Sequence, residues 1–271
     1  MTTLRGFGAR VQTVALSAAR ARMAVMGARD RIDDLVADAG LYDGSMLPYA
    51  AVDKAKVLHR LTVDNPAFHY AREDQIRRVM AAGFDMTAGE CNLAPSAEVL
   101  RWIAGRVTAD MITIETGAGQ TTVLFAALAK HHYCCTEAAE EIERIRTYME
   151  GIGIPSGNVT FLLGSSDVAL PQLKIGERFD FAFIDGCHGY PFPAMDWHHI
   201  DKLLRVGGLL GMDNVELRPV REHCEFLEEN GSYERIATIT AEGYFVRFYE
   251  KLRDEHREWV DQEYSRSKRD R

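Results

Sequence analysis

The sequence has no run of about 18 or more consecutive apolar residues, so it predicts no integral membrane segment. Its five cysteines form no C-x-x-C pair, and their number is odd, so neither a disulfide framework nor a zinc ribbon is indicated. Positive charge is also short, because 32 Lys and Arg stand against 40 Asp and Glu. The net charge of −8 argues against a nucleic-acid partner. A reducing, cytoplasmic setting fits these absences best.

What the chain does have is enough apolar residues for a large core, at 46% of 271 residues. Residues 1–95 show helical spacing at Val11–Ala18 and Ile32–Ala39, and no strand pattern. Further helices are predicted at 52–61 and 73–82. We expect this region to be a helical cap or an oligomerisation arm, through which a homo-oligomer could form. Its first 31 residues are basic, which suits packing, dimer contact or adhesion to a membrane surface, and a signal peptide is less favoured.

The rest of the chain is organised around residues 111–122, MITIETGAGQTT. The apolar, β-branched start predicts a short buried strand, and an apolar helical pattern follows the glycines at once. A strand, a glycine-rich turn and a helix make up a nucleotide-binding unit, in which missing Cβ atoms let the backbone approach a ligand. The turn alone is weak evidence, because GxGxxT lacks the third glycine of the dinucleotide fingerprint.

Strands and helices then alternate through residues 96–250. After the first unit the expected strands are 132–136, 159–163, 179–184 and 209–212, and the expected helices between and after them are 138–150, a short helix after 167, 194–204 and 219–229. Residues 233–240 and 244–249 predict a closing β-hairpin. The fold class is therefore α/β, a Rossmann-like, seven-stranded, mostly parallel sheet with an antiparallel terminal hairpin strand, plus the N-terminal helical region. The charged residues 251–271 predict a solvated helix or tail.

Polar residues follow the predicted parallel strands, at the edge where open α/β sheets bind ligands. They are Glu115, Glu137, Ser165, Ser166 and Asp167, Asp185 with His188, and Asp213 with Asn214. Glu137 lies about 20 residues past the first glycine, where a carboxylate can accept both ribose hydroxyls. The alternative is that Glu137 only caps a surface helix.

Taken together, residues 96–250 resemble the class I S-adenosylmethionine-dependent methyltransferases. ETGAGQTT is similar to their first motif, Glu137 to the acid after strand two, and FIDGCHGY and LLRVGGLLGMDNV to the motifs of strands four and five. The resemblance implies S-adenosylmethionine as the cofactor. Its expected contacts are Glu115, Gly117, Ala118, Gly119, Thr121, Thr122, Glu137, Ser165, Ser166, Asp167 and Asp185.

Within that group the sequence is closest to small-molecule O-methyltransferases of the catechol O-methyltransferase type. That resemblance implies metal ligands at Asp185, Asp213 and Asn214. Three oxygen donors suit a hard cation such as Mg²⁺, although another divalent cation would also fit. The alternative is that Asp213 and Asn214 only cap a turn while Asp185 lines the cofactor site.

The sequence departs from this family three residues past Asp185, where His188 replaces a lysine base. A histidine takes a hydroxyl proton near neutral pH with little tuning, so His188 is a candidate general base, with Asp185 beside it in the catalytic pair. It could equally contact a metal or the adenine. Tyr190, Phe192 and Trp197 could form an apolar wall for the acceptor or pack under the loop.

The sequence thus predicts a methyltransferase that acts on a hydroxyl of a small-molecule acceptor with the help of a divalent cation. N-methylation and C-methylation stay open. Two other classes also stay open, an NAD-dependent oxidoreductase and a non-catalytic cofactor-binding or assembly protein. The predicted terminal hairpin disfavours the oxidoreductase, because a dinucleotide fold has a second mononucleotide half in that place.

Overall fold

The computed structural model describes residues 49–63, 81, 94–241, 244–255, 258 and 260–265. The chain divides into two compact units, residues 1–59 and 60–271. Helix α2, Tyr49–Thr62, includes the helix predicted at 52–61. The helices predicted at 11–18 and 32–39 lie outside the described residues, and the one at 73–82 is described only at residue 81. The roles expected for residues 1–95, including the oligomerisation arm, stay predictions.

Residues 112–251 form a seven-stranded sheet with the strand order β3-β2-β1-β4-β5-β7-β6. Five strands are parallel, and β7 runs antiparallel to both of its neighbours, β5 and β6. The bounds are β1 Ile112–Thr116, β2 His131–Thr136, β3 Val159–Leu163, β4 Phe179–Ile184, β5 Leu204–Met212, β6 Tyr233–Ala241 and β7 Tyr244–Lys251. The predicted fold class, with its terminal hairpin, is confirmed.

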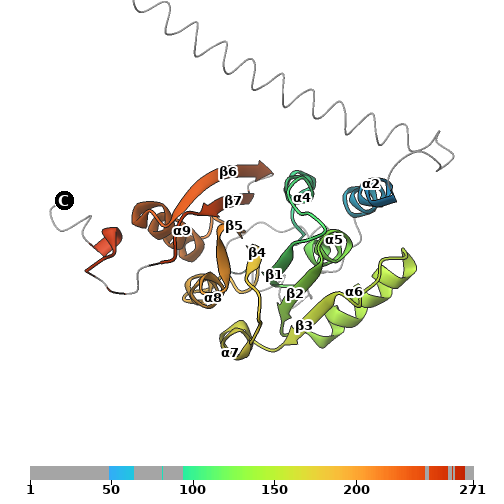
Figure 1. Ribbon diagram of the computed structural model, residues 1–271, viewed down its shortest axis with the longest axis horizontal. Coiled ribbons are helices and arrows are strands. Elements are labelled where there is room, and N and C mark those ends of the chain that lie inside the picture. Colours follow the sequence, from blue (N-terminus) through green and yellow to red (C-terminus); the bar gives the residue numbers. More distant parts are fainter. Residues whose placement is uncertain are drawn as a thin grey trace, which may run out of the picture. The chain divides into compact units, whose positions relative to one another are not determined.

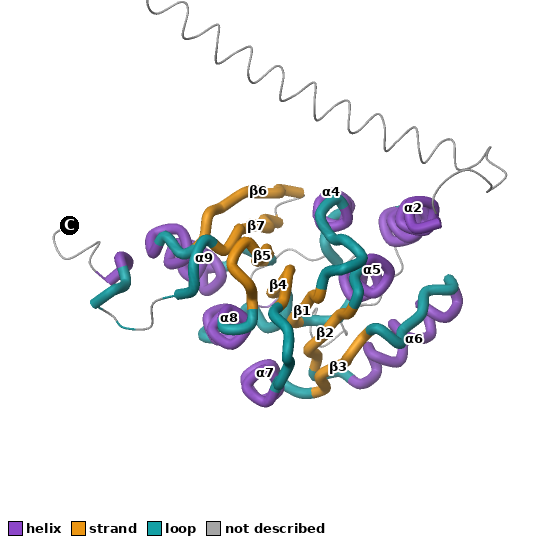
Figure 2. Tube along the Cα trace, viewed as in Figure 1, coloured by secondary structure: helices purple, strands orange, loops and turns teal. Residues whose placement is uncertain are grey.

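Helices cover both faces of the sheet, as right-handed crossovers between parallel strands require. Helices α4, α5 and α6 lie on one face and α7, α8 and α9 on the other (Figures 1 and 2). Their bounds are α4 Ala97–Ala104, α5 Gln120–Leu128, α6 Ala139–Gly151, α7 Ser166–Gln172, α8 Phe192–Asp201 and α9 Arg218–Asn230. Ser96 caps α4 as its residue type predicts, since its hydroxyl accepts from the Val99 N–H. No helix among the described residues is long and apolar enough to cross a bilayer.

Two elements differ from the sequence prediction. Strand β5 begins at Leu204 rather than at 209, because the Gly207-Gly208 pair forms an irregularity within the strand and not a turn before it. Gly207 has a φ of 73°, and a Cβ on Gly208 would lie 2.8 Å from the Arg205 carbonyl oxygen, so the irregularity depends on both glycines. In the described part of the tail, the only helical residues are the 3₁₀ turn η1, Glu263–Ser265.

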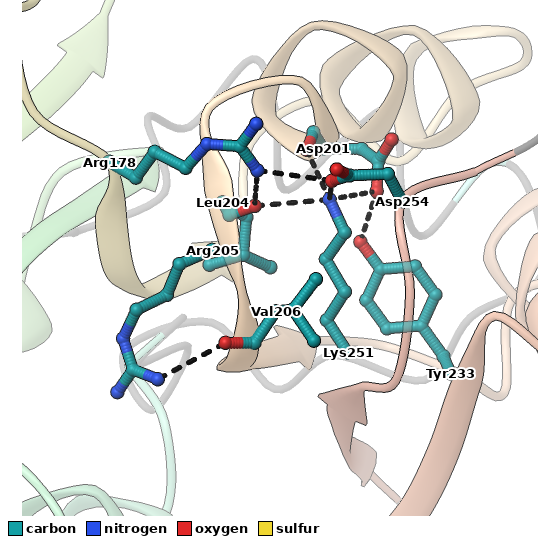
Figure 3. Close-up of polar contacts among 8 residues, drawn as sticks. All are labelled: Arg178, Asp201, Leu204, Arg205, Val206, Tyr233, Lys251 and Asp254. Carbon is teal, nitrogen blue, oxygen red and sulfur yellow. Dashed lines mark hydrogen bonds and ion pairs between the residues drawn. The ribbon is translucent and has the colours of Figure 1, made fainter.

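A fully buried lysine at the end of β7 joins the end of α8 to the start of β5, at the edge of the sheet opposite the predicted site. Lys251 Nζ donates to the carbonyl oxygens of Asp201 (2.6 Å) and Leu204 (3.0 Å), and it lies 3.0 Å from Asp201 Oδ1 (Figure 3). The Tyr233 hydroxyl donates to the same Asp201 oxygen at 2.6 Å. Asp254, held also by Arg178, makes a further ion pair with Lys251 at 3.0 Å. Because every proton of this ammonium has a partner, its burial is compensated.

This cluster gives a prediction for stability. Lys251→Met keeps the volume of the side chain but leaves the Asp201 carboxylate buried without its cation. We expect the free energy of unfolding to fall by about 3–5 kcal/mol, measured by urea denaturation. The exposed neighbour Lys202 provides the matched control, since Lys202→Met should change stability by no more than about 0.5 kcal/mol. Equal effects of the two substitutions would contradict the assignment.

Candidate active site

The register of the central strands brings three chain segments to one edge of the sheet. Thr116 of β1 pairs with Ile184 of β4, and Ile184 pairs with Met212 of β5. The next residue in each strand is therefore Gly117, Asp185 or Asp213. Backbone hydrogen bonds continue the alignment, from Asp185 N–H to Thr116 O (3.0 Å) and from Asp213 N–H to Ile184 O (3.1 Å). The structure thus places the glycine turn beside Asp185, and Asp185 beside Asp213.

The glycine turn is shaped by close backbone packing below and open space above. Gly117 has a φ of 85°, and a Cβ there would lie 2.1 Å from the Asp185 carbonyl oxygen, so only glycine fits. A Cβ on Gly119 would meet nothing within 4 Å. Gly119 precedes α5, and its N–H donates to Thr122 Oγ1 at 2.9 Å. The turn has the room that a ligand approaching the backbone and the start of α5 requires.

Glu115 and Thr122 lie inside the protein, beneath this turn. Glu115 is 1% exposed and Thr122 is fully buried. The Thr122 hydroxyl donates to Glu115 Oε1, and His132 Nε2 lies 3.1 Å from the same oxygen. Ala118 and Thr121 are buried as well. These side chains can support the turn from below, and their predicted contact with the cofactor stays a prediction.

Two further predicted segments follow β2 and β3. Glu137 is exposed directly after β2. Ser165 precedes α7, and Ser166 and Asp167 form its first turn, all three half-buried. Strands β2 and β3 are parallel neighbours, so these residues share the sheet edge with Gly117. Because Glu137 is exposed, its carboxylate can accept hydrogen bonds from a ligand outside the protein.

Asp185, His188 and Asp213 form a compact cluster, in which one ligand atom from each lies within 4.8 Å of the others. His188 Nε2 is 3.7 Å from Asp185 Oδ1. Burial raises the pKa of Asp185 well above its ordinary value, and the adjacent Asp213 carboxylate raises it further. Burial also raises the pKa of Asp213 to about 6 and lowers the pKa of His188 to about 4. The cluster thus concentrates negative charge that a cation would stabilise, beside a neutral imidazole at pH 7.

Asn214, the third predicted ligand, is held by a residue that the sequence analysis missed. Its backbone is left-handed, with a φ of 53°, and its Nδ2 donates to Glu216 Oε1 at 2.7 Å. Glu216 Oε2 in turn accepts from the Phe245 N–H of β7 at 3.0 Å. With its amide nitrogen engaged, Asn214 has its carbonyl oxygen left for a ligand. The only sequence signal for Glu216 was a further acid two residues past Asn214.

The three aromatic residues predicted to face the acceptor, one in the β4–α8 loop and two in α8, differ in their surroundings. Trp197 is buried and packs against His223 and Phe226 of α9, so the second of its two predicted roles, packing, is the one the structure supports. Tyr190 is 82% exposed, two residues past His188. Phe192, the first residue of α8, is half-buried. Tyr190 alone is exposed enough to lie against an acceptor over much of its ring.

Asp196 of α8 is another acid that the sequence analysis did not select. Its side chain is fully buried, and burial raises its pKa to about 6, while the nearby Ser166 and Thr116 hydroxyls lower it. It lies near the end of β1 and the start of α7, but neither of its carboxylate oxygens has a hydrogen-bond partner among the described residues. Nothing in its sequence context distinguishes it from a surface acid on a helix, so only the structure could find it.

Comparison with known proteins assigns the part of the chain that holds this edge. Residues 114–215 match the model of a family described as a methyltransferase domain. The matched segment is therefore similar to a methyltransferase domain, although the match covers less than half of the chain. It contains Glu115, Glu137, Asp185, His188 and Asp213, and it extends from β1 to the residue after Asn214. No curated protein matches the sequence.

Solved structures of methyltransferases are similar to this chain in fold. The O-methyltransferase TomG from Streptomyces achromogenes, involved in tomaymycin synthesis and solved with S-adenosylmethionine, has 21% identity and a TM-score of 0.52, over 68% of this chain and 91% of that chain. A candidate O-methyltransferase from Klebsiella pneumoniae has 19% identity and a TM-score of 0.54, over 75% and 97%. An rRNA methylase from Streptococcus thermophilus, at 18% identity over 58% and 96%, reaches a TM-score of only 0.48. The family model and the fold together support the class I methyltransferase resemblance drawn from the sequence.

The acid cluster of Asp185 and Asp213 predicts that the stability of the protein depends on pH. Without divalent cations, folded protein keeps the Asp213 proton up to about pH 6, whereas the unfolded chain releases it near its ordinary pKa of 3.8. The folded state therefore binds more protons in this window, and stability contributed by Asp213 is lost as the pH rises. Asp213→Asn should remove that loss and the repulsion between the two acids, so the variant should be more stable than the wild type by at least about 1 kcal/mol at pH 7, but not near pH 3.

The measurement is urea denaturation of both proteins in chelator between pH 3 and pH 8. The difference between variant and wild type reports the Asp213 and Asp185 pair and cancels the titration of more distant groups. Asp261→Asn, at an exposed position, serves as the control and should give a flat difference. A flat difference for Asp213→Asn as well would contradict the burial of its charge.

Proposed function

We propose that the protein is an S-adenosylmethionine-dependent methyltransferase that transfers a methyl group to a hydroxyl of a small-molecule acceptor, assisted by a divalent cation. One observation carries the proposal: within a methyltransferase domain, the register sets Gly117, Asp185 and Asp213 side by side at the ligand edge of the sheet. A donor site and a cation site then lie next to each other, as a metal-assisted transfer requires.

The cofactor side of the site fits S-adenosylmethionine in shape and charge. The open space at Gly119 admits the methionine part against the backbone, and the exposed Glu137 carboxylate accepts the ribose hydroxyls. Ser166 and Asp167 border the adenine. Bound S-adenosylmethionine supplies an electrophilic methyl carbon on a sulfonium, while the protein contributes orientation.

The acceptor side fits a divalent cation, because its donors are the oxygens of Asp185, Asp213 and Asn214. Mg²⁺ is the expected ion. A cation held by these residues would lower the pKa of an acceptor hydroxyl and offset the repulsion between the two carboxylates. The hydrogen bond from Asn214 Nδ2 to Glu216 fixes the orientation of the Asn214 amide, so that its oxygen points away from Glu216.

His188 is placed to take the hydroxyl proton. Burial keeps its imidazole neutral at pH 7, while the Glu216 carboxylate raises its pKa. Asp185 lies 3.7 Å away, where its charge would also stabilise the imidazolium that forms. The acceptor oxygen then forms its bond to the methyl carbon as the bond from that carbon to sulfur breaks. Asp185 acts in this step by orienting His188 and by its charge.

The cofactor assignment is tested by calorimetric titration of S-adenosylmethionine. Glu137→Ala removes hydrogen bonds between a charged acceptor and the ribose, which contribute about 1.5–3 kcal/mol. We expect affinity to fall about 10- to 100-fold. Glu140→Ala, at an exposed position on α6, is the matched control and should change affinity less than about twofold. An equal affinity for wild type and Glu137→Ala would refute the ribose contact.

The cation assignment makes a separate prediction. Turnover of a hydroxylated acceptor should vanish in chelator, return with Mg²⁺, and vanish in Asp213→Ala while S-adenosylmethionine affinity stays within about threefold. The physical reason is that the acceptor hydroxyl loses the charge that lowers its pKa. Full turnover in chelator would indicate a metal-free reaction that relies on His188 alone.

A further inference from the structure

His132 is a buried histidine with a bonding partner at each ring nitrogen. It is the second residue of β2 and is fully shielded from solvent. Its Nδ1 lies 2.8 Å from Thr113 Oγ1, and its Nε2 lies 3.1 Å from Glu115 Oε1. Its ring stacks on Phe125 of α5, with a centroid distance of 4.9 Å and an interplanar angle of 19°. The ring is therefore fixed in position and in rotation.

These contacts belong to a chain of hydrogen bonds that ends at the glycine turn. Glu115 Oε1 receives both His132 Nε2 and the Thr122 hydroxyl, and Thr122 Oγ1 accepts the N–H of Gly119. A hydroxyl has one proton to donate, so a Thr122 that donates to Glu115 has only its lone pairs for Gly119. The donor in each hydrogen bond is thereby fixed: Gly119 N–H donates to Thr122, and Thr122 donates to Glu115.

The buried Glu115 carboxylate needs these donors. A carboxylate that is 1% exposed is costly unless it is hydrogen-bonded and paired. Among the residues that the structure describes, His132 alone contacts this carboxylate with a side chain that can carry positive charge. Without His132, Glu115 would lose one of its buried hydrogen-bond donors and would either rotate its side chain or move towards water. Either change would disturb Thr122, and through Thr122 the N–H of Gly119.

We infer that His132 is a positioning residue for the cofactor turn: acting through Glu115 and Thr122, it holds Gly119 in the conformation that binds S-adenosylmethionine. This rests on the proposed function, and it adds a residue that touches neither cofactor nor acceptor. Thr113 belongs to the same hydrogen-bond network, because its hydroxyl contacts His132 Nδ1.

A metal ion is the competing occupant of this cluster. Glu115, His132 and Cys134 could in principle offer three ligand atoms within 4.8 Å of one another. However, the 3.1 Å between His132 Nε2 and Glu115 Oε1 is a hydrogen-bond distance, and Thr122 Oγ1 lies among the three, 3.7 Å from Cys134 Sγ. The observed contacts satisfy these atoms with one another, so we assign the cluster to hydrogen bonding.

The test is a double-mutant cycle on S-adenosylmethionine affinity, measured by calorimetry, with circular dichroism as the check of folding. His132→Phe should weaken binding at least tenfold in the wild-type background. In a Glu115→Gln background the same substitution should cost less than about threefold, because His132 then has no carboxylate to act through. A merely structural role would lower affinity by the same factor in both backgrounds, and that result would overturn the inference.

His131→Phe is the matched control, since His131 is the neighbouring residue and bonds to Thr160 of β3 instead of Glu115. It should change affinity less than about twofold. Thr113→Val, which keeps the side-chain shape and removes only the hydroxyl, tests the inference should His132→Phe not fold. It should weaken binding about threefold, and unchanged binding would overturn the inference.

Three further outcomes are decisive. If wild-type protein binds no S-adenosylmethionine, the proposed function fails, whereas tight wild-type binding with equal affinity in His132→Phe overturns only the inference. Zinc analysis of the purified protein covers the competing occupant. One equivalent of zinc in the wild type that is lost in His132→Phe would replace the hydrogen-bond assignment with a metal site.

Discussion

The site depends on the in-register pairing of β1, β4 and β5, which end together at Thr116, Ile184 and Met212. A shift of one residue would turn every side chain of a strand to the other face of the sheet. The contact between Gly117 and the Asp185 carbonyl oxygen then fixes the spacing of two neighbouring loops, since no side chain fits between them. Donor and acceptor sides of the site are adjacent because these three strands are.

The protein places its costly buried charges at opposite edges of one sheet and treats them differently. Lys251 has its partners in Asp201, Asp254 and two carbonyl oxygens, so its charge contributes to the stability of that side of the sheet. Asp185 and Asp213 face each other with raised pKa values, which is a cost in the absence of a cation. Repulsion between buried acids at one edge, and a buried charge with all its partners at the other, is the distribution expected of a binding site on a rigid scaffold.

The sequence predicted the strands and the acids that follow them, because apolar runs, glycines and strand-end acids are local signals. It could not reveal contacts between distant segments. The β5 start was missed since Gly207-Gly208 has the composition of a turn. Glu216 and Asp196 were missed because their roles come from folding, through Asn214 in one case and through the end of β1 in the other. His132 reads as an ordinary strand residue until β1 is set beside β2.

The central claim is that the edge formed by the β1 turn and the neighbouring strand ends binds S-adenosylmethionine. The most direct measurement is an NMR titration of ¹⁵N-labelled protein with S-adenosylhomocysteine, the product form of the cofactor. The account predicts saturable shifts at the amides of Gly117 and Gly119, near Glu137, and at Ser166 and Asp167. Shifts confined to the opposite edge near Lys251, or no saturable shifts at all, would contradict it.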